Sequence, residues 1–260
     1  MISILLSVRD NYDGFLVKTL ESISRQTYTD WELIAVDDGS SDNTSEILNK
    51  FFERYRGRVK IITNKENIGL TKSIILAENL AHGQYLARID SGDEFLPDKL
   101  QKQIRYIESN KELGIVGCNY FNKNLYSKNT KKCIMPEADS LIRRTILRRN
   151  PFAHSCVVMC RDIYRKAGGY NPAVAFGQDY DLWFRVLRIS KAANLQEFLC
   201  LRTIHAQSIS YTKQRDQMRQ CLKTQWKYMN KWNPINYVWL IEPSIIMIMP
   251  TKIKNLARKF

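Results

Sequence analysis

The sequence predicts an α/β fold with a mostly parallel central sheet and a helical extension at its C-terminal end. In the first third of the 260-residue chain, short β-branched runs alternate with segments of helical period. Strand–helix–strand repeats at this spacing form right-handed crossovers between parallel strands. The hydrophobic fraction of 44% and the charged fraction of 25% are typical of a globular protein. After Pro234 the chain becomes apolar with a basic end, which marks the extension.

Short runs of β-branched and aromatic residues between polar turns predict the first four strands. They span Ile2–Ser7, Glu32–Val36, Val59–Thr63 and Tyr85–Ile89. The first run lacks a basic region before it, and Arg9 and Asp10 follow it at once, so we expect a buried strand and not a signal peptide. Segments of helical period between the strands predict helices at Phe15–Arg25, Asp42–Arg54 and Leu70–His82.

The second half of the chain predicts further helices and strands with longer connections. The helices span about Pro97–Ser109, Asp139–Arg149, Asp179–Ile189 and Thr212–Lys231. The strands lie near Ile115–Phe121, Ser155–Cys160 and Leu195–Thr203. The basic stretch Lys123–Met135 shows neither period and predicts an irregular connection.

The charge balance predicts an anionic partner. The chain has 40 Lys plus Arg against 26 Asp plus Glu, a net charge of +14 and a pI near 9.5. A nucleotide, a phosphorylated substrate, nucleic acid or an acidic membrane face would each fit. The six cysteines form no CxxC pair, so we expect reduced thiols in a cytosolic protein. Glu242 and Pro243 interrupt the apolar stretch Ile235–Met249, so we expect no membrane-spanning helix.

Three polar clusters directly follow predicted strands. They are Arg9 to Asn11, Asp37 to Ser40 and Asp90 to Asp93. Ligands of parallel sheets bind at the carboxyl ends of the strands, so we expect these clusters to converge on one crevice. Neither GxxxxGK[ST] nor GxGxxG occurs, which argues against ATP hydrolysis and dinucleotide redox chemistry. A carboxylate-lined nucleotide site indicates a divalent cation that bridges a diphosphate, although Asp90 to Asp93 taken alone would also suit a turn before Pro97.

Taken together, these motifs resemble those of family 2 glycosyltransferases, which are inverting enzymes that use nucleotide-diphosphate sugars. Asp37–Asp42 is similar to the family turn DDGSTD, and Ala87–Asp93 resembles its strand end aRlDaDD. Further similar segments are Ile4–Asn11 (PVYN), Leu20–Val36 (SIL.QTY.N.EiI), Asn67–Leu70 (N.GL), Gly168–Tyr170 (GGy), Gly177–Arg185 (EDyDLwlR) and Arg202–His205 with Ser208 and Ser210 (yRiH..s.S). The resemblance covers about residues 1–211.

The resemblance implies a GT-A fold, the Rossmann-like fold of nucleotide-diphospho-sugar transferases, over residues 1–211. Residues 1–95 would form the nucleotide-sugar half and residues 96–211 the acceptor half. A helical, basic and apolar tail would follow over residues 212–260. The implied cofactor is one divalent cation, Mn²⁺ or Mg²⁺, with a nucleotide-diphosphate sugar as donor.

The resemblance also implies roles for individual residues. Asp179, at a predicted helix N-terminus, would be the general base for the acceptor hydroxyl, and Asp181 would support the loop. Asp93 would be the direct metal ligand, with Asp90 in the same diphosphate-metal site. Asp38 would hydrogen-bond the nucleotide base.

Six further residues complete the implied site. His205 would contact the metal or the diphosphate, and Arg88 and Lys72 would supply positive charge to the diphosphate. Other residues that would bind the donor are Ser7, Arg9 and Asn67. The family has Asp where this chain has Gly92, and Glu where it has Gln178.

The excess of positive charge has two further sources. Arg143, Arg144, Arg148 and Arg149 recur at helical spacing, which suits a solvated face, an anionic lipid surface or a lipid-linked diphosphate acceptor. The tail orders aromatic, apolar and basic residues in a way that favours an element at the membrane interface, with a core-packing or oligomer helix as the alternative. These residues are Tyr237, Trp239, Ile245, Ile246, Met247, Met249, Lys252, Lys254, Arg258 and Lys259.

We therefore predict an inverting glycosyltransferase of surface polysaccharide assembly, such as O-antigen or capsule. Its acceptor would be a lipid-linked glycan, its place the inner face of the cell membrane, and nucleic acid would not be a partner. One alternative is a nucleotidyltransferase of similar fold, which would need a Gly-rich loop after the first strand that Ser7–Tyr12 does not supply. A non-catalytic, basic membrane-binding or nucleic-acid-binding protein is the other, and it leaves the carboxylate clusters unexplained.

Overall fold

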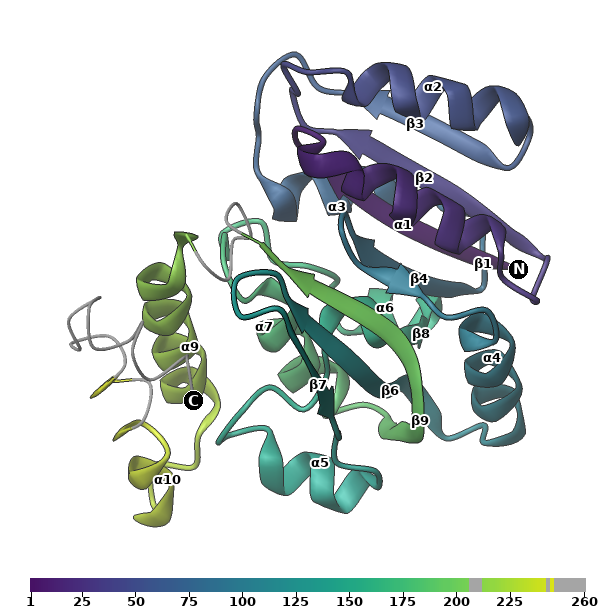
Figure 1. The fold of residues 1–260 in the computed structure, drawn as a ribbon. Helices are drawn as coiled ribbons and strands as arrows, with labels where there is room; N and C mark the ends of the chain where they lie inside the picture. The colour runs from purple at the N-terminus through teal and green to yellow at the C-terminus, as the bar shows by residue number, and fades with distance from the viewer. Residues whose placement is uncertain (206–211, 242–243, 246–260) are drawn as a thin grey trace.

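A single mixed sheet organises the described part of the chain, which in this computed structural model comprises residues 1–205, 212–241 and 244–245. The strand order is β3-β2-β1-β4-β8-β6-β9-β5, and β7 pairs with β6 beside this path. The sheet curls through the molecule with helices on both faces, and α9 and α10 lie at one side (Figure 1).

The strands are β1 (Ile2–Val8), β2 (Trp31–Asp37), β3 (Val59–Thr63), β4 (Tyr85–Asp90), β5 (Glu94–Phe95), β6 (Leu113–Asn124), β7 (Asn129–Cys133), β8 (Val158–Cys160) and β9 (Lys191–Ile204). The α-helices are α1 (Phe15–Ser24), α2 (Thr44–Arg54), α3 (Leu70–Asn79), α4 (Lys99–Ser109), α5 (Asp139–Thr145), α6 (Arg161–Lys166), α7 (Gln178–Val186), α9 (Gln214–Tyr228) and α10 (Ile235–Val238). Two 3₁₀ turns are η1 (Tyr12–Gly14) and η2 (His154–Cys156).

The predicted parallel arrangement is confirmed. Strand β1 pairs in parallel with β2 and β4, β2 pairs in parallel with β3, and β6 pairs in parallel with β9. Strands β5, β7 and β8 run in the opposite direction. Every residue of β1 and β2 is buried, because α1 and α2 cover one face of these strands and α3 covers the other. Burial on both faces explains why their sequences are mostly apolar and do not alternate with polar residues.

Several local predictions of the second half were wrong. The stretch Lys123–Met135 is not irregular, because β7 forms a hairpin with the end of β6. The four exposed residues of β7 are polar, so this strand has no apolar alternation that the sequence could reveal. The predicted strand Ser155–Cys160 is divided into η2 and β8. Strand β5 and helix α6 have two and six residues, which is too short to show a period.

The C-terminal helix α9 packs against α7. The rings of Phe184 and Tyr228 stack with centroids 4.7 Å apart and planes at 11°, and Tyr228 Oη also donates to Asp181 at 3.0 Å. No helix among the described residues is long and apolar enough to cross a membrane. The expected tail residues Ile246, Met247, Met249, Lys252, Lys254, Arg258 and Lys259, and the motif residues Ser208 and Ser210, lie outside the described residues.

One side chain is an unfavourable core residue. Lys99, at the start of α4, is fully buried with its Nζ 4.0 Å from the centre of the Phe95 ring. Its Nζ has no hydrogen-bond partner among the described residues. Burial lowers the pKa of Lys99, because an ammonium loses its hydration in the core. The fold therefore disfavours the charged form of this side chain.

Replacement of this ammonium is expected to stabilise the fold. Lys99→Met should raise the free energy of unfolding by about 1–2 kcal/mol, because methionine fills the site without desolvation of a charge. Urea denaturation at pH 7 measures the change, and Lys102→Met, on the partly exposed face of the same helix, should change it by less than about 0.5 kcal/mol. Because the folded-state pKa is lowered, wild-type stability should rise from neutral pH toward the unfolded pKa of about 10.4, with a smaller slope in the variant. A less stable Lys99→Met protein would contradict this account.

Candidate active site

The turn after β4 holds two carboxylates in a fixed relation. Asp93 N donates to Asp90 O at 3.0 Å, and Gly92 adopts φ +99°. Thr19 of α1 clamps this turn, since its Oγ1 accepts from Gly92 N at 2.9 Å and donates to Asp93 O at 2.8 Å. A residue with a Cβ is disfavoured at this φ, which explains why glycine occupies position 92.

Asp93 is buried where β4, η2 and β9 meet. Its Oδ2 accepts from Ser155 Oγ at 2.5 Å, and its Oδ1 accepts from Thr203 N at 3.0 Å. Arg202 Nε lies 3.6 Å from Oδ2. Burial raises the pKa of Asp93 to about 6, although Arg202 and the two hydrogen bonds act in the opposite direction. The position is therefore one where a second positive charge would be favourable.

Asp90 is in a different environment from Asp93. Burial would raise its pKa, but the ion pair with the Arg88 guanidinium outweighs this and lowers the pKa to about 2. The Asp90 side chain is 37% exposed, whereas that of Arg88 is 2% exposed. Asp90 is thus an ionised carboxylate at the open side of the turn. Nε and Nη1 of Arg88 have no hydrogen-bond partner among the described residues.

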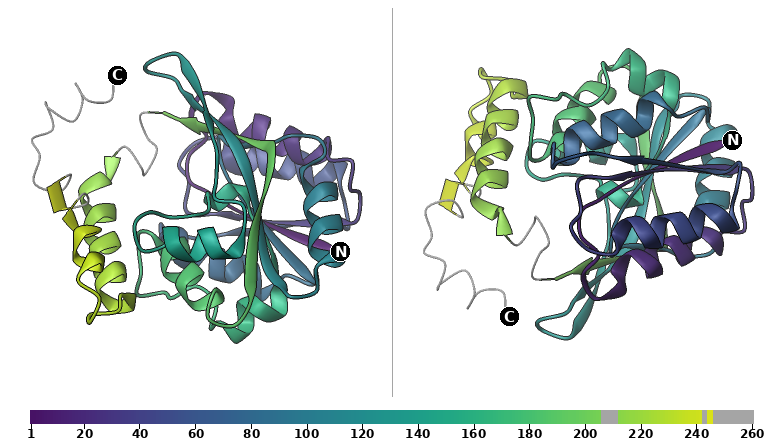
Figure 2. Two further views of the ribbon diagram at one scale, coloured as in Figure 1. Left: turned by 90° about the horizontal axis from the view of Figure 1, so that it is seen from below. Right: turned by 90° about the horizontal axis from the view of Figure 1, so that it is seen from above.

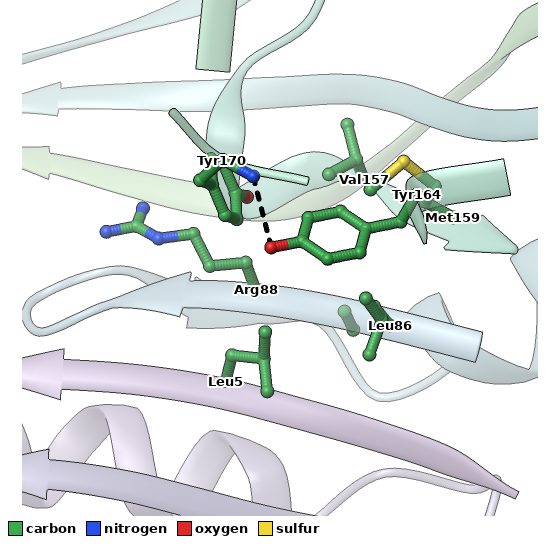
Figure 3. A pocket seen from close by; sticks show the side chains of 8 residues that line it. Leu5, Leu86, Arg88, Val157, Met159, Tyr164 and Tyr170 are labelled. Carbon is green, nitrogen blue, oxygen red and sulfur yellow. Dashed lines mark hydrogen bonds between the residues drawn. The ribbon is translucent and has the colours of Figure 1, made fainter. Parts of the chain in front are cut away.

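Behind Arg88 lies a cavity of about 10 Å³, which has room for one water molecule at most. Figure 3 shows Leu5, Leu86, Val157 and Met159 around it, with the Arg88 guanidinium extending away from it. Tyr164 Oη on its wall accepts from Tyr170 N at 3.1 Å (Figure 3). This cavity is a packing gap in the core and is too small for a sugar nucleotide.

His205, at the end of β9, lies beside the turn that carries Asp93. Its Nε2 is 3.8 Å from the point that a Cβ on Gly92 would occupy. The ring packs on Phe15 of α1 with centroids 4.8 Å apart. The structure thus places His205 beside the turn that carries Asp90 and Asp93, and a shared role for the three side chains stays a prediction.

Asp179 lies in the first turn of α7, two residues after Gly177, which precedes the helix with φ +64°. Its Oδ2 accepts from Asn150 Nδ2 at 2.8 Å. Burial raises the pKa of Asp179, while the nearby charges of Arg88 and Arg202 partly oppose the rise. The same two guanidinium groups interact with Asp90, so Asp179 shares one electrostatic environment with the carboxylates of the turn.

Asp181, two residues further along α7, has its oxygens occupied by other partners. Oδ2 is paired with Arg185 Nη2 at 2.9 Å, and Oδ1 accepts from Lys227 Nζ at 3.2 Å and from Tyr228 Oη at 3.0 Å. Asp181 is 2% exposed. It therefore holds α9 against α7, and its predicted support of the loop stays a prediction.

The ends of β1, β2 and β4 form one edge, as expected for the three clusters. Ser7 of β1 lies beside Val36 of β2 and Asp90 of β4 in the pairing register. Asp10 N donates to Ser40 Oγ at 2.9 Å, and Asp10 Oδ1 accepts from Ser41 N at 2.9 Å. The loop after β1 is thereby fastened to the loop after β2.

Asp38 is occupied by the loop at residues 64–69. Its Oδ1 accepts from Asn64 Nδ2 and Ile68 N, both at 2.9 Å, and its Oδ2 accepts from Gly69 N at 3.0 Å. It is 3% exposed. These three hydrogen bonds use most of the acceptor capacity of the Asp38 carboxylate. A hydrogen bond between Asp38 and the nucleotide base stays a prediction.

The remaining predicted donor residues are less constrained. Arg9 is 57% exposed, and its Nε lies 3.9 Å from Asp10 Oδ2. Asn67 and Lys72 are exposed, before and on the first turn of α3. Within the described residues, nothing connects these three side chains to Asp90 or Asp93.

Sequence reasoning missed several residues that hold the carboxylates. Ser155, Thr203 and Asn150 each donate a hydrogen bond to Asp93 or Asp179, and Thr19 closes the turn. Ser155 lies 62 positions and Thr203 lies 110 positions from Asp93 in the sequence, and Asn150 lies 29 positions from Asp179. Thr203 lies within the motif-like segment Arg202–His205, but no local pattern shows that it, Ser155 or Asn150 binds an aspartate, because the fold alone makes them neighbours.

Comparison with known proteins agrees with this geometry. The model of Glycosyl transferase family 2 matches residues 3–168. EpsE of Bacillus subtilis (strain 168) is 30% identical over 203 residues, which are 76% of this chain and 71% of EpsE. The O-antigen biosynthesis glycosyltransferase WbnJ of Escherichia coli is 32% identical over 80% of this chain and 81% of WbnJ.

A solved structure supports the fold independently. The crystal structure of S. aureus TarS 1-349 in complex with UDP superposes with a TM-score of 0.69 at 16% identity, covering 100% of this chain and 75% of that chain. The predicted GT-A fold is thereby confirmed. From the family match and the two sequence relatives, the chain belongs to glycosyl transferase family 2.

Proposed function

We propose that this chain is an inverting glycosyltransferase that moves a sugar from a nucleotide-diphosphate sugar to a hydroxyl of a lipid-linked glycan in surface polysaccharide assembly. The observation that carries the proposal is the common environment of Asp90, Asp93 and Asp179 around the guanidinium groups of Arg88 and Arg202. Family membership favours sugar transfer over nucleotidyl transfer and over a non-catalytic role. The name of WbnJ supports the polysaccharide setting, and the TarS complex with UDP supports a nucleotide donor.

The carboxylates of the turn fit a divalent cation, Mn²⁺ or Mg²⁺. Such ions prefer oxygen ligands and are held by one or two carboxylates together with substrate phosphates. Among the described residues, no three His, Cys, Asp or Glu side chains are arranged to hold an ion by themselves. Asp93 would be the direct ligand, with Asp90 and His205 beside it, and diphosphate oxygens would complete the coordination. When bound, the cation would neutralise charge on the departing diphosphate.

The transfer itself depends on Asp179. Its carboxylate would take the proton of the acceptor hydroxyl while the hydroxyl oxygen attacks the anomeric carbon. The bond from that carbon to the diphosphate breaks on the opposite face, so the configuration inverts. Arg202 and His205 would stabilise the leaving group. Arg88 would act on the diphosphate through Asp90, with which it is paired.

The nucleotide would lie along the edge formed by β1, β2 and β4. Ser7 stands at the centre of this edge, between the ends of β2 and β4. Arg9 would stack on the base, which the loop braced by Asp38 would flank. Asn67 and Lys72 would approach the donor from that loop and from α3. In this division, residues 1–95 bind the donor, residues 96–211 bind the acceptor, and residues 212–260 form the tail.

The surface of α9 and α10 suits attachment to an anionic membrane face. Trp232 is 95% exposed, and Ile235 is 55% exposed. Arg148 lies over the Trp239 ring at 5.1 Å, beside a groove of about 510 Å³ among α5, α7, α9 and α10. This surface is at the side of the molecule away from β1, β2 and β3 (Figure 2). Apolar and aromatic side chains beside arginines fit the headgroup region of an anionic bilayer. We place the protein at the inner face of the cell membrane.

The metal site predicts cation-dependent binding of a nucleoside diphosphate. Calorimetry with UDP, GDP, TDP and CDP should show one of them binding in Mn²⁺ or Mg²⁺ and at least about tenfold more weakly without the ion, because the ion bridges phosphate to carboxylate. Asp93→Asn should lose this dependence. Glu94→Gln removes the same charge from the adjacent residue and should bind as the wild type does. Cation-independent binding, or normal binding by Asp93→Asn, would refute the assignment.

The proposed role of Asp179 as the base predicts that its removal slows turnover without weakening diphosphate binding. Asp179→Asn should slow transfer by about 10²–10⁴-fold, because an amide cannot accept the proton, while diphosphate binding stays unchanged. The pKa of Asp179 is raised, so wild-type activity should fall as the pH drops through that raised pKa and the base becomes protonated. The control Asp162→Asn changes an exposed aspartate in the first turn of α6. Equal activity of Asp179→Asn and wild type would exclude the role.

The membrane surface predicts binding to anionic vesicles. The double variant with Trp232→Ser and Ile235→Ser should pellet several-fold less with phosphatidylglycerol vesicles, because both side chains are exposed and apolar. Leu80→Ser, on an exposed site of 44% at the end of α3, is the matched control and should pellet normally. Unchanged pelleting of the double variant would show that this surface does not contact lipid.

A further inference from the structure

Asn150 contacts Asp179, and neither the sequence motifs nor the proposed reaction gives Asn150 a role. Its Nδ2 donates to Asp179 Oδ2 at 2.8 Å. Its Oδ1 accepts from Phe152 N at 3.2 Å, which fixes the end of the carboxamide that faces the aspartate. Pro151 follows directly and limits the backbone freedom of this position. The side chain therefore presents a fixed donor to one carboxylate oxygen.

The segment that carries Asn150 is fastened to both α7 and α9. Tyr180, the residue after Asp179, donates from its hydroxyl to Ile146 O. Gln225 of α9, which is fully buried, donates from Nε2 to Leu147 O at 2.7 Å. These two bonds hold residues 146–150 against the start of α7. The contact between Asn150 and Asp179 is thus built into the packing of three elements.

We propose that Asn150 is a positioning residue that fixes the orientation of the Asp179 carboxylate and keeps it ionised, which rests on the proposed role of Asp179 as the base. A carboxylate at a helix start can rotate about its side-chain bonds, and a single donor to one oxygen selects one orientation. The other oxygen is then directed consistently toward an acceptor hydroxyl. Asn150 itself touches neither donor nor acceptor in this role.

The charged groups around Asp179 explain why an added donor matters. Arg88 on β4 and Arg202 on β9 face it with positive charge, and Tyr170 faces it from the loop before α7. Burial raises the pKa of Asp179, and the hydrogen bonds from Asn150 and from the Tyr180 backbone oppose that rise. The hydrogen bond from Asn150 thus favours the form that can accept a proton.

A direct titration of Asp179 tests the proposal without any sugar donor. Protein labelled with ¹³C at the aspartate carboxyl carbons gives one signal for Asp179, assigned by its absence in Asp179→Asn. Asn150→Ala should raise the pKa of Asp179 by about one unit, because a hydrogen bond to the ionised form is lost. Asn150→Asp should raise it further, because a like charge replaces the donor. An unchanged pKa in both variants would overturn the proposal.

The matched control separates positioning from support of the segment. Gln225→Ala loosens the segment at Leu147 without touching Asp179, so its Asp179 titration should follow that of the wild type. If Gln225→Ala shifts the titration as much as Asn150→Ala does, the effect belongs to the segment and the specific role of Asn150 is wrong.

Turnover distinguishes failure of this proposal from failure of the proposed function. Release of nucleoside diphosphate from UDP-glucose, UDP-N-acetylglucosamine and GDP-mannose is measured with Mn²⁺. Asn150→Ala should lower kcat about tenfold and move the acid limb of the pH profile upward, with diphosphate binding unchanged. If Asp179→Asn retains wild-type release, the base assignment fails and takes the positioning role with it. If Asp179→Asn stops release but both Asn150 variants match the wild type, only the positioning role is overturned.

Discussion

The candidate site depends on the hydrogen bonds that the buried carboxylate of Asp93 accepts. This carboxylate accepts hydrogen bonds from Ser155 of η2 and Thr203 of β9, while its own turn is clamped by Thr19 of α1. These contacts join the turn after β4 to α1 and to η2 and β9, which come later in the chain. An unpaired carboxylate in that place would be costly, so the fold supplies donors from each element around it. The same donors fix where a cation and a diphosphate would have to lie.

The guanidinium groups of Arg88 and Arg202 and the burial of each carboxylate give the acidic residues of the candidate site different pKa values. Arg88 is paired with Asp90, whose pKa falls to about 2, whereas burial dominates at Asp93 and raises its pKa to about 6. Burial also raises the pKa of Asp179, which has no such direct ion pair among the described residues. Carboxylates that share a site but differ in environment can carry different tasks. The proposed roles of Asp90 as an ionised carboxylate, Asp93 as a metal ligand and Asp179 as the proton acceptor fit this division.

Helix α9 connects the candidate base to the outer surface. Lys227 and Tyr228 bind Asp181 on α7, and Gln225 binds the segment that precedes Asn150. The other side of this region exposes Trp226 and Trp232. Contacts at this exposed aromatic surface and contacts at α7 therefore belong to one packed unit.

Local sequence was sufficient for the parallel strands, the helices between them and the placement of Asp90, Asp93 and Asp179 at element ends. Apolar runs and helical period reflect burial of each element, and burial is recorded residue by residue. Hairpin strand β7 escaped prediction because its exposed residues are polar and show no apolar alternation. The partners of the carboxylates also escaped it, since Ser155, Thr203 and Asn150 meet their aspartates only after the chain folds. The sequence by itself determined the fold class and the acidic residues of the site. Tertiary structure alone decided which of them are buried, paired or oriented, because hydrogen bonds between distant segments leave no local pattern.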